Sequence, residues 1–391
     1  MSVQGKFSRR TFLQAGGVLL VGIAGGGIFR AAQQGVFSVG QGVAYEPWTT
    51  WRDDMGEGPI SLVRAGLLAA NPHNSQPWFF RVTADQIDVY ADTSRQLGTV
   101  DPFLREMYVG LGCALENIML AAQAEGYTAA ITYMPTPSDV THVARIMLKT
   151  GTPTVSPLYE AIPRRRTNRL DYDVKRPVEQ TVLERLSALN DDSEVRILWV
   201  TEPDVRTRMS EQIVAATAAL IADEQQSIDS HAWWRGSWSQ LQAERDGITP
   251  DAGQPAALAA LIKMLPDSDR VTADGVFLDQ TRNRYTATAM GYGLIVVRDA
   301  MDNALRLRGG RLWQRIHLQA TVDGLAMQPL NQMPERADRE KQLGLEPEFT
   351  NALATFIDDT AYHTIMQFRF GYPTVQPTAP APRRSVESVL L

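Results

Sequence analysis

Four arginines lie within six residues in the middle of the chain, in the segment 162–169, Ile-Pro-Arg-Arg-Arg-Thr-Asn-Arg. A guanidinium presents a planar set of N–H donors that matches the oxygens of a phosphate or a carboxylate. Thr167 and Asn168 add a hydroxyl and an amide to the same segment. Such a segment predicts an anion-binding site, but taken alone it is also typical of a solvated basic loop.

Composition excludes several other kinds of site. The 391 residues are 44% hydrophobic and 21% charged, which predicts a globular protein of one large or two ordinary domains. The net charge of -6 gives no general attraction to nucleic acid. Because Cys113 is the single cysteine and the five histidines are scattered, we expect no internal disulfide and no structural metal. The sequence has neither a Walker loop nor a Gly-x-Gly-x-x-Gly between a strand and a helix.

Residues 1–32 are predicted to be a targeting signal. The segment 8–13, Ser-Arg-Arg-Thr-Phe-Leu, precedes an uncharged, mostly apolar run over residues 14–29. A basic start and a short apolar run are typical of an export signal. The paired arginines resemble the twin-arginine signal, which the translocation machinery reads as an address. We therefore expect export to the periplasm or another extracytoplasmic space, or membrane anchoring if the signal stays uncleaved.

Apolar periodicity predicts similar elements on both sides of the arginine segment, and so an α+β or α/β fold. The predicted helices are 58–70, 108–124, 181–189, 203–222, 305–323 and 349–358, and the predicted strands are 79–82, 86–90, 129–133, 144–148, 195–200, 291–297 and 364–370. Between them, residues 225–265 are predicted to be a lid-like insertion. Its tryptophans, Trp233, Trp234 and Trp238, are equally compatible with core packing.

Four segments resemble motifs of the nitroreductase-type flavoproteins. Residues 71–78, Asn-Pro-His-Asn-Ser-Gln-Pro-Trp, are similar to the family's Pro-Ser-x-x-Asn-x-Gln-Pro-Trp segment, and residues 165–169 to its Arg-Arg-Ser-x-Arg segment. Residues 324–329, Gly-Leu-Ala-Met-Gln-Pro, resemble its Gly-Leu-x-x-x-Pro turn. Residues 370–373, Phe-Gly-Tyr-Pro, with the later pair Arg383-Arg384, resemble its carboxyl-terminal strand and arginine.

The order of these motifs departs from the ordinary family pattern. The Arg-Arg-Ser-like segment usually precedes the Gln-Pro-Trp segment, but here it follows about ninety residues later. The chain therefore resembles the internally duplicated Acg-type branch, with nitroreductase-like halves at residues 45–155 and 160–391. This resemblance implies an α+β pseudo-dimer that holds one FMN and needs no further dimerisation. The Pro-rich tail after residue 373 would be an extended arm over the other half, or else a disordered terminus.

The resemblance also implies roles for individual residues. Arg165, Thr167 and one or both of Arg383 and Arg384 would bind the FMN phosphate, and Arg169 would reach the N1 and O2 edge of the ring. A backbone N–H near Gly324 and Leu325 would donate to N5. The first half would pack against the ring, although the family has Ser where this chain has His73, whose role stays open. The residues expected to bind the cofactor are Arg165, Arg166, Thr167, Arg169, Pro72, His73, Asn74, Gln76, Gly324, Leu325, Arg383 and Arg384.

The expected function is an exported FMN oxidoreductase that passes electrons to a quinone, a nitro compound or a similar small acceptor. Hydride transfer through a flavin requires no protein nucleophile, acid or base at the reacting carbon, so we predict no catalytic residue. Two alternatives are a flavin-binding or flavin-sequestering protein with little turnover and an exported interaction module whose arginines bind acidic partners. The sequence names neither the physiological donor nor the acceptor.

Overall fold

The computed structural model describes residues 30–391. The twin-arginine segment and almost all of the predicted signal therefore lie outside the described residues. No helix within residues 30–391 is long and apolar enough to cross a membrane.

The chain forms two four-stranded sheets with the same strand order. The first contains β1 (Trp78–Val82), β2 (Gln86–Ala91), β3 (Tyr127–Tyr133) and β4 (His142–Thr150) in the order β1-β2-β4-β3. The second contains β5 (Val195–Val200), β6 (Gly291–Val297), β7 (Ala326–Pro329) and β8 (His363–Gly371) in the order β5-β6-β8-β7. All neighbouring strands in both sheets are antiparallel, which confirms the α+β class over the α/β alternative.

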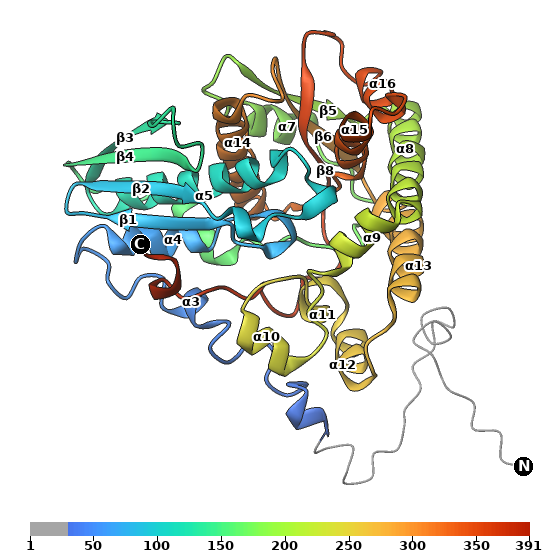
Figure 1. Ribbon diagram of the computed structural model, residues 1–391, viewed down its shortest axis with the longest axis horizontal. Coiled ribbons are helices and arrows are strands. Elements are labelled where there is room, and N and C mark those ends of the chain that lie inside the picture. The colour runs from blue at the N-terminus through green and yellow to red at the C-terminus, as the bar shows by residue number, and fades with distance from the viewer. Residues whose placement is uncertain (1–29) are drawn as a thin grey trace, which may run out of the picture.

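Two long helices, α5 (Arg105–Ala124) and α14 (Asn303–Val322), pack against each other between the two sheets (Figure 1). Each follows the second strand of its own half. Their backbones are close at Gly112 and Gly310. A Cβ on Gly112 would lie 2.1 Å from the carbonyl oxygen of Leu307, and a Cβ on Gly310 would lie 2.1 Å from that of Val109. Glycine at both positions therefore allows the two halves to share one core.

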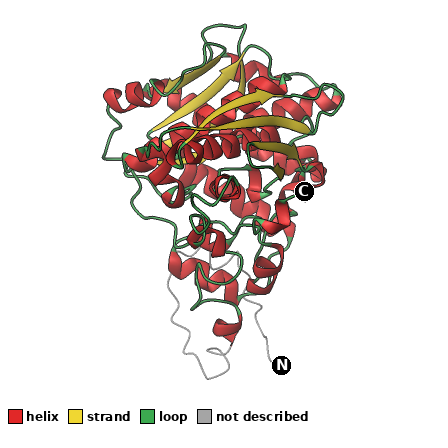
Figure 2. Ribbon diagram, turned by 90° about the vertical axis from the view of Figure 1, so that its left-hand side faces the viewer, coloured by secondary structure: helices red, strands yellow, loops and turns green. Residues whose placement is uncertain are grey.

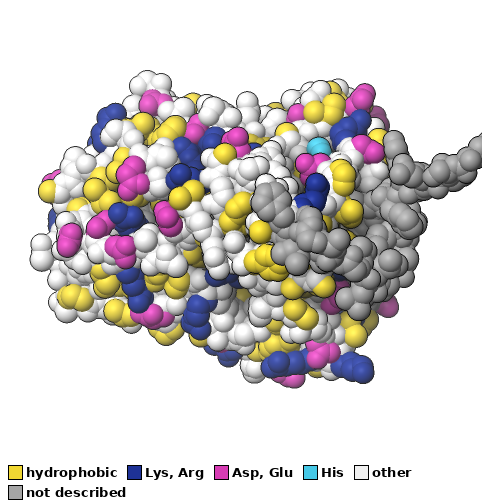
Figure 3. All heavy atoms as spheres, turned by 90° about the horizontal axis from the view of Figure 1, so that it is seen from below, with side chains coloured by type: hydrophobic (Ala, Val, Ile, Leu, Met, Phe, Trp, Pro, Cys, Tyr) yellow, Lys and Arg dark blue, Asp and Glu magenta, His cyan; other side chains and the backbone are white. Residues whose placement is uncertain are grey.

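The remaining elements cover the sheets and extend below them. The helices that precede the second sheet in the sequence are α3 (Glu46–Thr49), α4 (Ile60–Leu67), α6 (Pro157–Ala161) and α7 (Gln180–Ser187). Between β5 and β6 lie α8 (Pro203–Ala222), α9 (Glu224–His231), α10 (Trp238–Glu244), α11 (Pro250–Gly253), α12 (Ala256–Met264) and α13 (Arg270–Gln280), and α15 (Gln332–Leu343) and α16 (Glu348–Ala354) precede β8. The lid-like insertion is thus helical and lies on the side away from the sheets (Figures 1 and 2). On the lower face, acidic and basic side chains are interspersed (Figure 3).

The carboxyl-terminal segment returns to the first half after β8. The backbone N–H of Arg383 donates to the carbonyl of Ala44 at 2.7 Å, and that of Leu391 donates to the carbonyl of Phe80 at 2.8 Å. The indole N–H of Trp48 donates to the carbonyl of Ala381 at 2.8 Å. This crossing places residues from the end of the chain beside the start of the first half.

Candidate functional site

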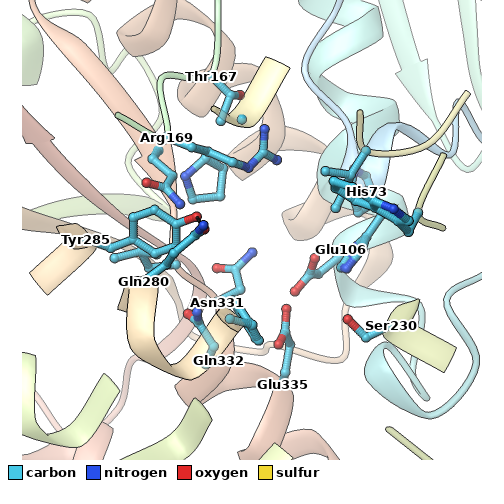
Figure 4. A pocket seen from close by; sticks show the side chains of 18 of the residues that line it. His73, Glu106, Thr167, Arg169, Ser230, Gln280, Tyr285, Asn331, Gln332 and Glu335 are labelled. Atoms are coloured by element: carbon cyan, nitrogen blue, oxygen red, sulfur yellow. Dashed lines mark hydrogen bonds between the residues drawn. The ribbon is translucent and has the colours of Figure 1, made fainter. Parts of the chain in front are cut away.

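A cavity of about 320 Å³ lies between the two halves, and a smaller pocket of about 50 Å³ adjoins it. Thr167 and Arg169 line both. The larger volume is within the range of small-molecule sites. Figure 4 shows Arg169 and Tyr285 on one side of the cavity, His73 on the other, and Glu106 and Glu335 facing the space between them.

The smaller pocket gathers Arg165, Arg166 and Arg383. Arg165 is 3% exposed and Arg383 is 2% exposed. Burial, together with the charge of Arg166, lowers the pKa of Arg165 to about 10. Burial and repulsion from the other two guanidiniums lower the pKa of Arg383 well below its usual value. Since no described carboxylate compensates these charges, the cluster is electrostatically suited to an anion.

The donors of this cluster are only partly satisfied. Nη2 of Arg165 donates to the carbonyl of Leu68 at 3.2 Å, but its buried Nε has no partner among the described residues. Arg383 is held more firmly, because Nε donates to the carbonyl of Leu67 at 2.6 Å and Nη2 to that of Ala69 at 3.0 Å. An unpaired buried N–H is costly, so the free donor of Arg165 favours a ligand in the pocket.

The rest of the arginine segment is positioned by the second sheet. Thr167 forms a bridge with Met327 of β7, and the N–H of Asn168 donates to the carbonyl of Met327 at 3.1 Å. This pairing directs Arg169 toward the cavity, where no hydrogen bond or ion pair engages its guanidinium within the described chain. Arg164 is exposed and lies outside both the cavity and the pocket. The segment is therefore mostly buried rather than a solvated loop.

The first half supplies a short loop whose backbone is in the left-handed region. The φ angles are 46° at His73, 57° at Asn74 and 53° at Gln76. Left-handed backbone is uncommon for residues other than glycine and often marks a functional site. Pro72 and His73 line the cavity, and Asn74 lines the smaller pocket. Burial and the charge of Arg169 lower the pKa of His73 to about 4, so this imidazole is neutral at pH 7.

Four residues that were expected to bind the cofactor line neither the cavity nor the smaller pocket: Gly324, Leu325, Gln76 and Arg384. Gly324 and Leu325 lie outside the cavity, because the N–H of Leu325 donates to the carbonyl of Ala320 at 2.8 Å and closes the end of α14. The N–H of Gly324 likewise donates within the chain, to the carbonyl of Thr321 at 3.4 Å. Gln76 is buried behind the loop, where its Nε2 donates to the carbonyl of Arg245 at 2.8 Å. Arg384 points away toward Asp92 and the carbonyl of Ser388, so Arg383 alone of the pair enters the pocket.

The lid-like insertion contacts the first half directly. Asp246 is buried and forms ion pairs with Arg235 of the insertion, at 2.8 Å, and with Arg95 of the first half. The N–H of Gly247 donates to the carbonyl of Asn74 at 3.3 Å. Trp234 lines the cavity wall. The insertion therefore covers the cavity and fixes the loop that forms one of its sides.

Two cavity residues were missed in the sequence analysis, Glu106 of α5 and Glu335 of α15. Their carboxyl groups are hydrogen-bonded to each other. Burial raises the pKa of Glu335 to about 7 and raises that of Glu106 well above its usual value. For Glu106, the available signal was a glutamate just before the long apolar segment of residues 107–115.

Three curated relatives match most of this chain. No protein-family model matches it. The "Putative NAD(P)H nitroreductase Rv3131" of Mycobacterium tuberculosis is 26% identical over 338 residues, 84% of this chain and 90% of the relative. The "Putative NAD(P)H nitroreductase acg" of the same organism is 28% identical over 70% of this chain and 80% of its own. An uncharacterized protein of the same organism, Rv3127, is 25% identical over 84% of this chain and 92% of the relative. These relatives support the nitroreductase-like relationship that the motifs indicate.

Solved nitroreductase structures match a smaller part of the chain. The FMN-dependent nitroreductase NfnB of Mycobacterium smegmatis, in complex with NADPH, covers 59% of this chain with 15% identity and a TM-score of 0.35. A nitroreductase of Desulfitobacterium hafniense with bound FMN covers 59% with 12% identity and a TM-score of 0.35.

Proposed function

We propose that this protein is an FMN-binding oxidoreductase of nitroreductase type, in which two fused halves build one flavin site. The observation that carries the proposal is the uncompensated cluster of Arg165, Arg166 and Arg383 beside a cavity between the halves. A phosphate group would satisfy both the positive charge and the unpartnered Nε of Arg165. The equal strand order of the two sheets supports the interpretation as a pseudo-dimer in one chain.

The described residues fit FMN in two ways: they line a cavity joined to a smaller pocket, and the pocket is positively charged. Arg165, Arg166, Thr167 and Arg383 would hold the phosphate, and Asn74 would complete that pocket. Arg169 lies where the cavity and the pocket meet and would face the electron-rich edge of the ring. Pro72 and His73 would contact the ring from the first half. Bound FMN would accept and deliver a hydride or electrons, while the protein orients the reactants and limits access of water.

The buried insertion supports a second candidate, a flavin-sequestering protein with little turnover. Its ion pairs through Asp246 and its contact with the 72–74 loop hold the cover in place. An interaction module that binds acidic macromolecules fits the structure poorly, because Arg165 and Arg383 are buried and cannot reach the surface of a partner.

Purified protein mixed with FMN distinguishes these functions. We expect it to retain one flavin per chain after desalting, to be bleached by NADPH, and to regain its absorbance when a benzoquinone or a nitroaromatic compound is added. Retention without bleaching by NADPH or by a chemical reductant would favour sequestration. Failure to retain flavin at all would refute the proposed cofactor.

We also propose export through the twin-arginine pathway, which rests on residues 8–29 and the absence of charge after Arg10 in that segment. An exported enzyme meets little NAD(P)H, so its physiological donor would be a membrane or protein partner. Changing Arg9 and Arg10 to lysine is expected to leave the folded protein in the cytoplasm. The amino-terminal mass of the exported wild type shows whether the signal is cleaved or anchors the protein. Equal export of wild type and variant would contradict the proposal.

A further inference from the structure

The cavity has a second polar end, opposite its arginines. Figure 4 shows the carboxyl groups of Glu106 and Glu335 pointing toward each other, across the cavity from Arg169. Glu106 is 6% exposed and Glu335 is 7% exposed, and both line the cavity. They come from different halves of the chain, so their pairing exists only in the folded protein.

The pair shares its nearest cation, Arg105, with other carboxylates. Arg105 is 3.5 Å from Glu106, but its closer ion pair is with Asp338, at 2.7 Å. Asp101 accepts from the N–H groups of Glu106, at 3.1 Å, and Met107, at 2.9 Å, so a further carboxylate lies beside the pair. The charged or titratable groups near this region are Arg105, Asp101 and Asp338 behind the pair, Arg306 of α14, and, lining the cavity, His73, Cys113, Arg169, His231, Asp274 and Tyr285. Two buried carboxyl groups in such surroundings cannot both be ionised, and they retain a proton.

A neighbouring side chain independently indicates a ligand at this end. Gln332 lies one turn before Glu335 on α15, lines the cavity and is 4% exposed. Its Oε1 is buried and has no hydrogen-bond partner among the described residues. A buried acceptor without a donor is unfavourable, so a ligand hydroxyl or N–H in the cavity would stabilise it.

We infer that Glu106 and Glu335 are the proton-donating site for an acceptor of the quinone class, which binds between them and the arginine end. This inference rests on the proposed function. Reduction of a quinone to a hydroquinone takes up one hydride, supplied from bound flavin, and one proton. An O–H bond of the glutamate pair breaks, a new O–H bond forms on the quinone oxygen, and the pair is left with one more negative charge. Water then returns the proton, and Gln332 accepts a hydrogen bond from the product hydroxyl.

The raised pKa values agree with this role. With the pKa of Glu335 raised to about 7 and that of Glu106 raised well above its usual value by burial, the pair retains a proton near neutral pH. A general acid works best when its pKa lies near the working pH. The Glu335 carboxyl is protonated below about pH 7 and loses its proton as the pH rises through that value.

The test compares wild type with Glu335→Gln and Glu106→Gln. In the flavin-free protein, we expect an infrared carbonyl band of a protonated carboxyl group that fades as the pH rises through about 7 and is missing in the double variant. In the flavin-loaded protein, reoxidation by a benzoquinone should be on the order of 10²-fold slower in each single variant. Reoxidation by ferricyanide, which takes an electron without a proton, should be unchanged.

The matched control is Glu340→Gln, which changes a buried glutamate of the same helix that lies outside the cavity. It should reoxidise with both acceptors at the wild-type rate. An unchanged quinone rate in the Glu335 and Glu106 variants, or an equal loss with both acceptors, overturns the proton-donor role while the flavin assignment stands. Absence of the carboxyl band also overturns it. A protein that binds no flavin overturns the proposed function, and this role with it.

Discussion

Replacing Arg165 by alanine is expected to weaken FMN binding by roughly 10²-fold, so that flavin is lost on desalting. Arg165 is buried in the smaller pocket, and its free Nε is the donor best placed to meet a phosphate there. A hydrogen bond to a charged group contributes about 1.5–3 kcal/mol, and a bidentate guanidinium contact reaches the upper part of that range. Fluorescence titration of the apoprotein with FMN measures the change.

The adjacent Arg164→Ala variant is the control for this prediction. Arg164 is exposed, and its Nε donates only to the carbonyl of Glu160 at 3.3 Å, so FMN affinity should stay at the wild-type value. Arg165→Ala also relieves repulsion with Arg166 and Arg383, so the apoprotein should still fold. FMN should then raise the melting temperature of wild type but not of the variant. Equal affinity in the two variants would show that the phosphate lies elsewhere.

Replacing Gly310 by alanine is expected to destabilise the protein by about 3 kcal/mol or more, at the upper end of what overpacking costs. The new Cβ would lie 2.1 Å from the carbonyl oxygen of Val109, and the neighbouring atom is backbone that cannot rotate away. Helices α5 and α14 would have to separate. Since both halves contribute to the cavity, FMN binding should fall together with the stability. Urea unfolding followed by circular dichroism measures the loss.

A second helical glycine, Gly275 of α13, provides the comparison. A Cβ at this position would meet no heavy atom within 4 Å. Gly275→Ala should therefore keep the wild-type stability or gain up to about 1 kcal/mol, because alanine favours the helix. If Gly310→Ala and Gly275→Ala unfold at the same urea concentration, the close approach of α5 and α14 does not determine the stability of the fold.

Local apolar patterns in the sequence were sufficient to predict many of the helices and strands. Helix α8 and strands β5 and β6 have the predicted bounds, and β6 is a continuous apolar segment that is buried along its whole length. Helix α15 was missed for a physical reason. Its buried face contains Glu335, Arg336 and Glu340, and Nη1 of Arg336 donates to Oε1 of Gln226 in α9 at 2.5 Å. Buried polar residues of this kind are compensated by distant parts of the chain, which periodicity cannot detect.

The candidate site, like the fold, could be predicted from the sequence only in part. Arg165, Arg169 and His73, which the motif resemblance singled out in short continuous segments, line the cavity or the smaller pocket. Gly324 and Leu325, which it also singled out, line neither, and their N–H groups are used to end α14. The pairing of Glu106 with Glu335 could not be predicted, since it depends on how one half docks on the other.

Arg383 is held by residues from near the start of the chain, so the pocket around it can form only after almost the whole chain has been synthesised. Its guanidinium donates to the carbonyls of Leu67 and Ala69, residues synthesised more than three hundred positions earlier. A nascent chain that has reached only the arginine segment has Arg165 but lacks Arg383 and therefore cannot complete the smaller pocket. Cofactor loading would then follow translation, and flavin content would distinguish completed molecules from fragments.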